Sequence, residues 1–341
     1  MTLDAACEGA GAPLDSRMVD PSPRPLLATL ALALGLALGG CASTLATAPV
    51  RFDDQSASQE TLEIEGLASC RPEQPDELTL NPDEPLVVIV HGCFSSGGAF
   101  RELAEVFEFH GQQTACFNYD DRWGLRPTAD RLRTVLDNLG RRMAEQEIVV
   151  LGHSQGGMVS RIAMSDVESD RQPPAGRYRL VTVSSPLNGI DAAAHCGLPW
   201  LHWISLGITS GVCQAITGSK WPDIHPRSGF WTDPDPLNAN VSEHLMIVSD
   251  EEGSCRRRDD DGECEEDDFV FTVTEQDNPR ITADGRVTAL TIEAGHVAIV
   301  GERGLTYPQR LIEALQAHAV MRPTPVDQQV AFESMIRRVY F

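Results

Sequence analysis

A serine in a glycine-rich turn is the first feature of this sequence that points to chemistry. Ser154 lies in the pentapeptide Gly-His-Ser-Gln-Gly at 152–156, directly after the apolar run 147–151 and before a stretch with helical spacing. A serine on such a strand–turn–helix junction has a strained backbone, and the glycines let strand and helix approach closely. This context is typical of a serine nucleophile, although a glycine-rich turn without chemistry can have the same five residues.

Two further segments carry residue types that such a serine would need. The apolar run 86–90 predicts a buried parallel strand and leads into a loop of small residues at 91–98. Residues 287–292 predict another strand, and His296 follows it next to Gly295. A histidine just past a strand end is placed to reach a serine hydroxyl and accept its proton.

With these three motifs in this order, the chain resembles the α/β-hydrolase superfamily, in particular bacterial lipases and esterases whose oxyanion loop begins His-Gly. The resemblance spans about residues 85–319. It implies that Ser154 is the nucleophile and His296 the general base. It also implies that the backbone N–H groups of Cys93 and Gln155 bind the oxyanion of the tetrahedral intermediate.

The carboxylate that would orient His296 is harder to assign. In the resembling enzymes it follows the strand after the cap, which here is 244–249. Several carboxylates come directly after this strand, whereas 255–266 looks like an inserted excursion, and Asp267 behind it fits the family spacing. We therefore predict Asp267 as the acid. Any of these carboxylates could instead be a solvated charge on an acidic loop. The alternatives, in order, are Asp268, Glu252 and Asp250, and Glu251 lies in the same run.

The N-terminal part has the features of an export signal. An apolar run at 26–40 follows Arg24 and is too short for a comfortable membrane-spanning helix. Residues 38–41 resemble the bacterial lipoprotein processing box, which implies cleavage before Cys41 and lipid on its sulfur. We expect a signal peptide at 1–40, with Met18 as an alternative start, and a lipid-anchored protein of the bacterial cell envelope. An outer-membrane position facing the periplasm or the exterior is the expected location, and an uncleaved anchor is the alternative.

Composition limits the partners. The chain has 341 residues, 42% of them hydrophobic and 23% charged, which is typical of a globular protein with one large core. Its formal net charge of −23 repels nucleic acid and anionic lipid head groups, so we expect no nucleic-acid partner. A neutral small-molecule or lipid ester is the expected substrate, with no cofactor. We also expect no metal, because the acidic stretch 259–268 lacks the alternating ligand spacing of a calcium loop.

Export would allow disulfides. The pair predicted most strongly is Cys255 with Cys264, nine positions apart around an acidic loop. A second pair within the cap and a third between neighbouring strands are weaker predictions. Apart from Cys7 and Cys41 the chain has seven cysteines, so one thiol must stay unpaired. These weaker predictions are Cys196 with Cys213 and Cys93 with Cys116, while Cys70 stays unassigned.

Strand and helix patterns alternate from residue 85, which predicts an α/β fold with a mostly parallel, doubly wound sheet flanked by helices. Four of the five tryptophans lie in a region that does not continue the sheet, and we interpret this region as a cap over the active site. The predicted organisation is a tether at 41–60, a hydrolase domain at 61–322 with a cap at about 190–240, and an amphipathic tail at 323–341.

Together these features predict a serine hydrolase that cleaves carboxylic esters through Ser154, His296 and Asp267 and an acyl-enzyme. The motif sets the reaction type and leaves the acyl group open, so a lipase, phospholipase, thioesterase, amidase or acyltransferase would show the same pattern. A catalytically silent hydrolase fold serving as an envelope binding or scaffold lipoprotein is the alternative from another class.

Overall fold

The computed structural model describes residues 47–53, 61–71, 77–93, 95–143, 146–166, 172–191 and 218–341. The predicted signal peptide, the predicted lipidation site Cys41 and the predicted disulfide pair of Cys196 with Cys213 lie outside the described residues. Within them, no helix is long and apolar enough to cross a membrane.

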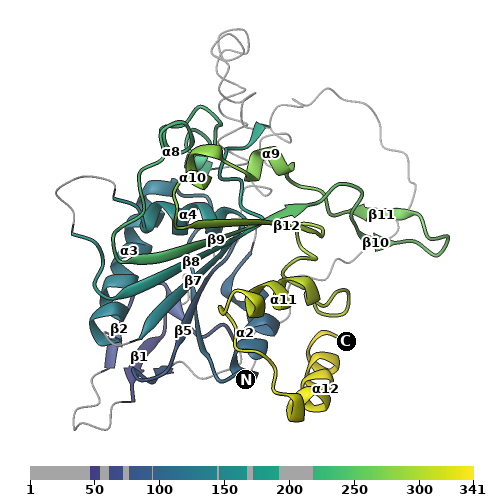
Figure 1. Ribbon diagram of the computed structural model, residues 1–341, viewed down its shortest axis with the longest axis horizontal. Helices are drawn as coiled ribbons and strands as arrows, with labels where there is room; N and C mark the ends of the chain where they lie inside the picture. Colours follow the sequence, from purple (N-terminus) through teal and green to yellow (C-terminus); the bar gives the residue numbers. More distant parts are fainter. Residues whose placement is uncertain are drawn as a thin grey trace, which may run out of the picture. The chain divides into compact units, whose positions relative to one another are not determined.

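A seven-stranded sheet is the centre of the fold (Figure 1). All neighbouring strands are parallel except for the antiparallel pair at one edge. The carboxyl ends of the parallel strands therefore share one edge of the sheet, where open α/β sheets bind ligands. This arrangement confirms the predicted mostly parallel sheet. In spatial order the strands are β12 (Val287–Glu293), β9 (Val241–Asp250), β8 (Arg177–Val183), β7 (Glu147–His153), β5 (Leu86–Val90), β6 (Gln113–Phe117) and β3 (Leu67–Ala68).

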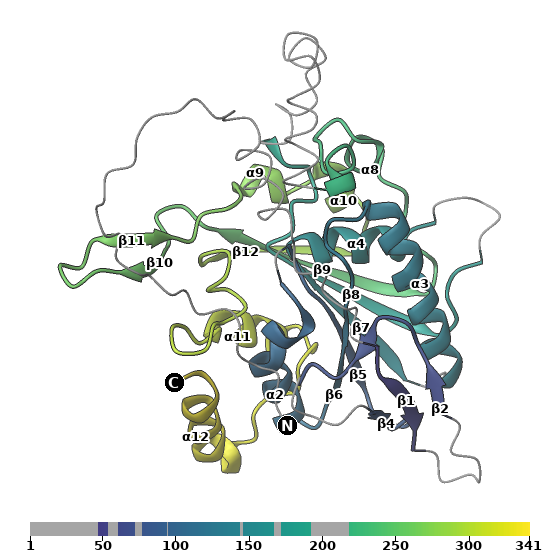
Figure 2. The same cartoon turned by 180° about the vertical axis from the view of Figure 1, so that it is seen from behind.

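Helices cover both faces of the sheet (Figures 1 and 2). Successive side chains of a strand point to opposite faces. In β5, accordingly, Val88 and Val90 belong to one apolar cluster, and Val87 and Ile89 to the other. The first cluster includes α3 (Leu125–Arg142) and α4 (Gln155–Ala163), and the second includes α2 (Arg101–Phe109), α11 (Gln309–Ala317) and α12 (Gln329–Tyr340).

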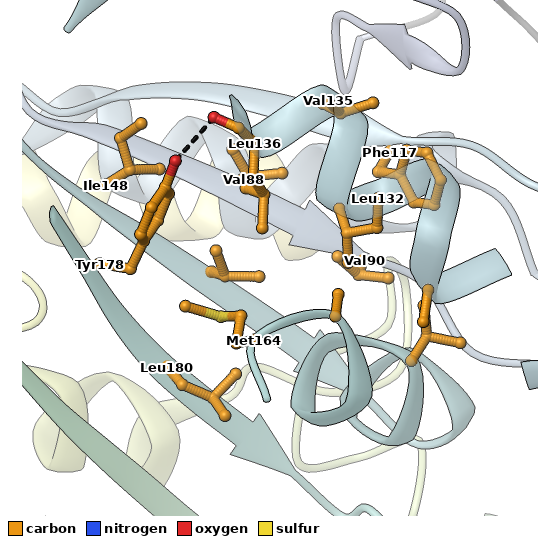
Figure 3. Close-up of a cluster of buried hydrophobic side chains, with 14 of the residues drawn as sticks. Val88, Val90, Phe117, Leu132, Val135, Leu136, Ile148, Met164, Tyr178 and Leu180 are labelled. Atoms are coloured by element: carbon orange, nitrogen blue, oxygen red, sulfur yellow. Dashed lines mark hydrogen bonds between the residues drawn. The ribbon is translucent and has the colours of Figure 1, made fainter. Parts of the chain in front are cut away.

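The core on the α3 side also buries a phenol. Tyr178 of β8 is fully buried among aliphatic side chains, and its hydroxyl donates a hydrogen bond to the Leu136 carbonyl, 2.6 Å away (Figure 3). Because the buried hydroxyl has an acceptor, it does not incur the desolvation cost of an unpaired polar group.

The first described segments of the chain form short strands, one of them within the predicted tether. Residues 49–52, within the predicted tether, form β1 (Pro49–Phe52), whose Val50 and Phe52 are buried. The segment 61–68 is divided at Gly66, whose φ is +82°. Its first part, β2 (Thr61–Glu63), pairs with β1 in a small sheet that also contains β4 (Leu78–Leu80), and its second part is β3.

The predicted tail is a helix packed on the domain. After the turn η3 (Val326–Gln328), helix α12 buries five side chains in the second apolar cluster. In the predicted cap, residues 192–217 lie outside the described residues. The described part contains the 3₁₀ turn η2 (Gly218–Lys220) and the short helix α8 (Gly229–Thr232).

The predicted disulfide between Cys255 and Cys264 is confirmed, and it closes the hairpin of β10 (Cys255–Arg258) and β11 (Cys264–Asp267). The predicted pair of Cys93 with Cys116 is wrong. Cys116 is bonded to Cys70, and Cys93 is a free thiol. The reason is the antiparallel β3–β6 pair, which sets Ala68 opposite Cys116 and so brings Cys70 close.

The turn between β7 and α4 requires glycine. A Cβ at Gly156 would lie 2.1 Å from the Val90 carbonyl oxygen, and one at Gly152 would lie 2.5 Å from the Gly156 carbonyl oxygen. Since these contacts are to backbone atoms, no rotamer change relieves them. Helix α4 can therefore approach β5 and β7 only while both positions lack a side chain.

We predict that Gly156→Ala lowers the free energy of unfolding by about 1–3 kcal/mol, the usual cost of overpacking. Urea denaturation measures the change. Gly229→Ala is the matched control, because a Cβ there has no atom within 4 Å. Equal stability of the two variants would contradict the close approach at the turn.

Candidate active site

Ser154 occupies the strained turn between β7 and α4. Its φ is 56° and its ψ is −126°, a region that a residue with a side chain rarely adopts. The Ser154 N–H donates to the Val183 carbonyl at 2.9 Å, which ties the turn to the neighbouring strand β8. Strain of this kind costs about 1–3 kcal/mol and tends to occur at functional sites. The structure therefore places Ser154 as the sequence pattern predicts.

His296 lies in the loop after β12 and is held through its backbone. Its N–H donates to the Asp268 carbonyl at 2.9 Å. Its carbonyl accepts a hydrogen bond from Nε2 of His153, also at 2.9 Å. The ring centroids of His153 and His296 are 4.8 Å apart. Burial, followed by the nearby His296, lowers the pKa of His153 to about 3, so His153 is a neutral donor with its proton on Nε2.

The carboxylate beside His296 is Glu251. Nδ1 of His296 lies 2.9 Å from Oε1 of Glu251, and the Glu251 side chain has no exposed area. Glu251 comes one residue after the end of β9, which is the parallel neighbour of β12. In this geometry Nδ1 is the donor, so the remaining nitrogen of a neutral imidazole can accept a proton.

Four other hydrogen bonds hold Glu251 in place. Oε1 also accepts from Ser249 Oγ at 2.7 Å and from Ser184 Oγ at 3.3 Å. Oε2 accepts from the N–H groups of Val270 at 2.6 Å and Phe271 at 2.8 Å. Burial alone would raise the pKa of Glu251, but its hydrogen bonds to His296, Ser249 and Phe271 outweigh that effect and lower the pKa. The carboxylate is thus held in its charged form.

The predicted acid, Asp267, is not brought to His296. It is the last residue of β11, is exposed, and accepts a hydrogen bond from Phe269 N at 3.0 Å. The excursion predicted at 255–266 exists as a disulfide-closed hairpin, but the carboxylate that contacts His296 comes before it in the chain. Asp267 is therefore corrected to Glu251 as the partner of His296.

The side chains of the remaining candidate acids, Asp268, Asp250 and Glu252, do not orient His296 in the described structure. Asp268 is buried, and its two oxygens accept from the N–H groups of Val297 and Ala298, each at 2.9 Å, so that it fixes the turn after His296. Asp250 accepts from the N–H of the exposed Glu252 at 3.3 Å. In the described part of the structure, neither the Asp268 side chain nor the Asp250 side chain has a hydrogen bond to His296.

The loop after β5 carries Cys93, and Gln155 begins α4. The N–H groups of the first turn of a helix have no partner within the helix, so that of Gln155 is available to an oxyanion. The thiol of Cys93 donates to the Gln155 side-chain oxygen at 2.6 Å, so the two residues predicted to supply the oxyanion donors lie side by side.

A cavity of about 570 Å³ lies at this site. Its walls include Ser154, His296 and Cys93, which come from three different loops at the carboxyl edge of the sheet. Among the described residues, no group of three His, Cys, Asp or Glu side chains is arranged to hold a metal ion. The lining also contains apolar and charged side chains, namely Ala99, Phe100, Val297 and Val300, and Glu102, Arg256, Glu302 and Arg303.

Sequence comparison finds known proteins to which part of this chain is similar. Residues 81–220 match the family described as "Putative serine esterase (DUF676)". The lysosomal thioesterase PPT2 homolog of Drosophila melanogaster is 28% identical over 174 residues, which cover 48% of this chain and 56% of that protein. The human lysosomal thioesterase PPT2 is 28% identical over 172 residues, covering 48% and 54%. The match therefore spans about half the length of these relatives.

A solved structure resembles the fold. The lipase BlEst2 of Bacillus licheniformis, in its propeptide form, superimposes with a TM-score of 0.50 at 17% identity, covering 70% of this chain and 51% of that one. Together with the strand order and the strained serine turn, this likeness defines the chain as an α/β-hydrolase fold.

We predict that Glu251 makes a pH-dependent contribution to the free energy of unfolding. Its folded pKa lies below its ordinary value of 4.5, so the stabilisation is fully present above that value and is lost as pH falls through the folded pKa. The difference in free energy of unfolding between wild type and Glu251→Gln should be largest at neutral pH and shrink on acidification. Chemical denaturation at a series of pH values measures it. The exposed Glu252→Gln is the control, and a difference that does not vary with pH would contradict the assignment.

Proposed function

We propose that this protein is a serine hydrolase that cleaves carboxylic esters through an acyl-enzyme, with Ser154 as nucleophile, His296 as general base and Glu251 as the acid. The observation that carries this proposal is the buried Glu251–His296 hydrogen bond beside a serine on a strained turn, with the serine and the histidine lining one cavity. The match to a family described as a serine esterase supports it.

The proposed mechanism follows from the placement of the groups. His296 removes the proton of Ser154 Oγ as the hydroxyl attacks the ester carbonyl, and Glu251 stabilises the resulting imidazolium without taking the proton. The N–H groups of Cys93 and Gln155 bind the oxyanion. His296 then protonates the leaving alcohol. Finally it activates a water molecule, which releases the acid and regenerates Ser154.

Thioesters are the second candidate substrate class, because the relatives at 28% identity are named thioesterases. Attack by a serine on a thioester needs the same nucleophile, base and oxyanion donors, so the site does not separate the two. The ratio of kcat/KM on an oxoester and a thioester with the same acyl group would decide between them.

We predict that Ser154→Ala abolishes p-nitrophenyl ester turnover and fluorophosphonate labelling, with a loss of about 10⁶ in kcat, the size seen when a catalytic serine is removed. Ser95→Ala is the matched control, since Ser95 lines the same cavity but is not on the strained turn. Labelling that persists in Ser154→Ala would move the nucleophile elsewhere and refute the proposal.

We also predict that Glu251→Gln lowers kcat by about 10⁴, because a neutral partner no longer holds the correct imidazole tautomer. Asp267→Asn and Glu252→Gln should retain kcat within about threefold, since both side chains are exposed and the described hydrogen bond to the His296 ring comes from Glu251. Steady-state kinetics on folded variants tests this. A large loss in Asp267→Asn with little change in Glu251→Gln would reverse the assignment.

A further inference from the structure

A buried ammonium group contacts the side chains of both proposed oxyanion residues and has no part in the mechanism above. Lys220, the only lysine in the chain, is 4% exposed. Among the described residues, the nearest carboxylate oxygen is Asp121 Oδ2, 3.8 Å from Nζ. Burying a charge this deeply is costly unless its hydrogen-bond donors are satisfied, so the contacts of Nζ indicate what keeps Lys220 in this position.

The three hydrogens of the ammonium have three acceptors. Nζ donates to the Cys93 sulfur at 3.0 Å, to the Asp121 carbonyl at 2.6 Å, and to the side-chain oxygen of Gln155. The Cys93 thiol itself donates to that oxygen, and Gln155 Nε2 donates to the Asp121 carbonyl at 3.0 Å. The two proposed oxyanion residues, 62 positions apart in the sequence, are thus joined through a single cation.

Lys220 is itself held in place. In the same 3₁₀ turn, the N–H of Ser219 donates to the Arg122 carbonyl at 2.8 Å, and the Lys220 carbonyl accepts from Asp223 N at 2.9 Å. An Asp223 oxygen accepts from the N–H of Leu125 at 2.8 Å, at the start of α3. The ammonium is therefore carried by a segment bonded to the body of the domain.

We infer that Lys220 is a positioning residue for the oxyanion site. By binding the side chains of Cys93 and Gln155 together, it fixes the distance between their two backbone N–H groups, and it places a positive charge behind them. This inference rests on the proposed function. Lys220 is not among the residues that line the described cavity, so it acts through its two neighbours rather than on the substrate.

This arrangement bears on catalysis because an oxyanion donor is effective only at about 2.7–3.1 Å from the developing charge. A misplacement of about 1 Å can cost on the order of 100-fold in rate. A tetrahedral ammonium can donate to three acceptors spread around it, whereas a planar guanidinium presents its donors in one plane. Arginine at this position would keep the charge but not the geometry.

The kinetic test compares three variants. Lys220→Met should lower kcat on p-nitrophenyl esters about 10- to 100-fold while KM changes less than about threefold, since ground-state binding does not use the donors. Lys220→Arg should be intermediate. Ser219→Ala is the control, because it alters the same turn without touching the ammonium, and should keep kcat within about twofold. A folded Lys220→Met with wild-type kcat overturns the inference.

A second measurement needs no variant of Lys220. Protein labelled with ¹⁵N-lysine has a single Nζ resonance, because the chain has one lysine. Fluorophosphonate modification of Ser154 should shift that resonance, and the same treatment of Ser154→Ala should not. An unshifted signal in fully modified protein overturns the inference. Wild-type protein that neither labels nor turns over esters would instead refute the proposed function, and this inference with it.

Discussion

The constraint on which the rest of the structure depends is the strained backbone at Ser154. A residue with a side chain keeps a φ of 56° only where its surroundings leave no alternative, and here the surroundings are strand β8 on one side and the close approach of α4 to β5 on the other. The result is that the Ser154 hydroxyl and the N–H of Gln155, the first residue of α4, emerge at the same point. His296, the proposed base, and Glu251 must both come to this point.

Strand register brings them there. Strands β9 and β12 are parallel neighbours, and their last residues, Asp250 and Glu293, are paired in the register. Glu251, which follows β9, and the loop that follows β12 therefore start next to each other at the carboxyl edge of the sheet. The buried Glu251 side chain can therefore form its 2.9 Å hydrogen bond to His296. Its charge is tolerated because backbone and hydroxyl donors surround it, which is the condition under which a carboxylate can stay ionised away from water.

The sheet, the serine turn and the histidine loop could be predicted from the sequence, because apolar strands, helical spacing and glycine positions are local signals. The position of Glu251 could not. It lies in a run of carboxylates that look alike in sequence, and only the strand register shows which one is buried. The assumption that the acid follows the inserted hairpin led to Asp267. Lys220 was missed for a related reason: its three acceptors come from segments far apart in the chain, and its own segment has no periodic pattern.

The β10–β11 hairpin has a base that is tied to the domain and a turn at its other end that is exposed to solvent. At its base, Cys255 is tied by a disulfide to Cys264 at the start of β11, and Arg256 donates to both Glu302 oxygens at 2.7 Å. At the far turn, a Cβ added to Gly262 would contact no atom within 4 Å. A change of length at that turn is therefore absorbed by solvent-exposed chain. A change at the base would displace Glu251 on one side and Asp268 on the other, so tolerance to insertion should fall steeply over a few residues.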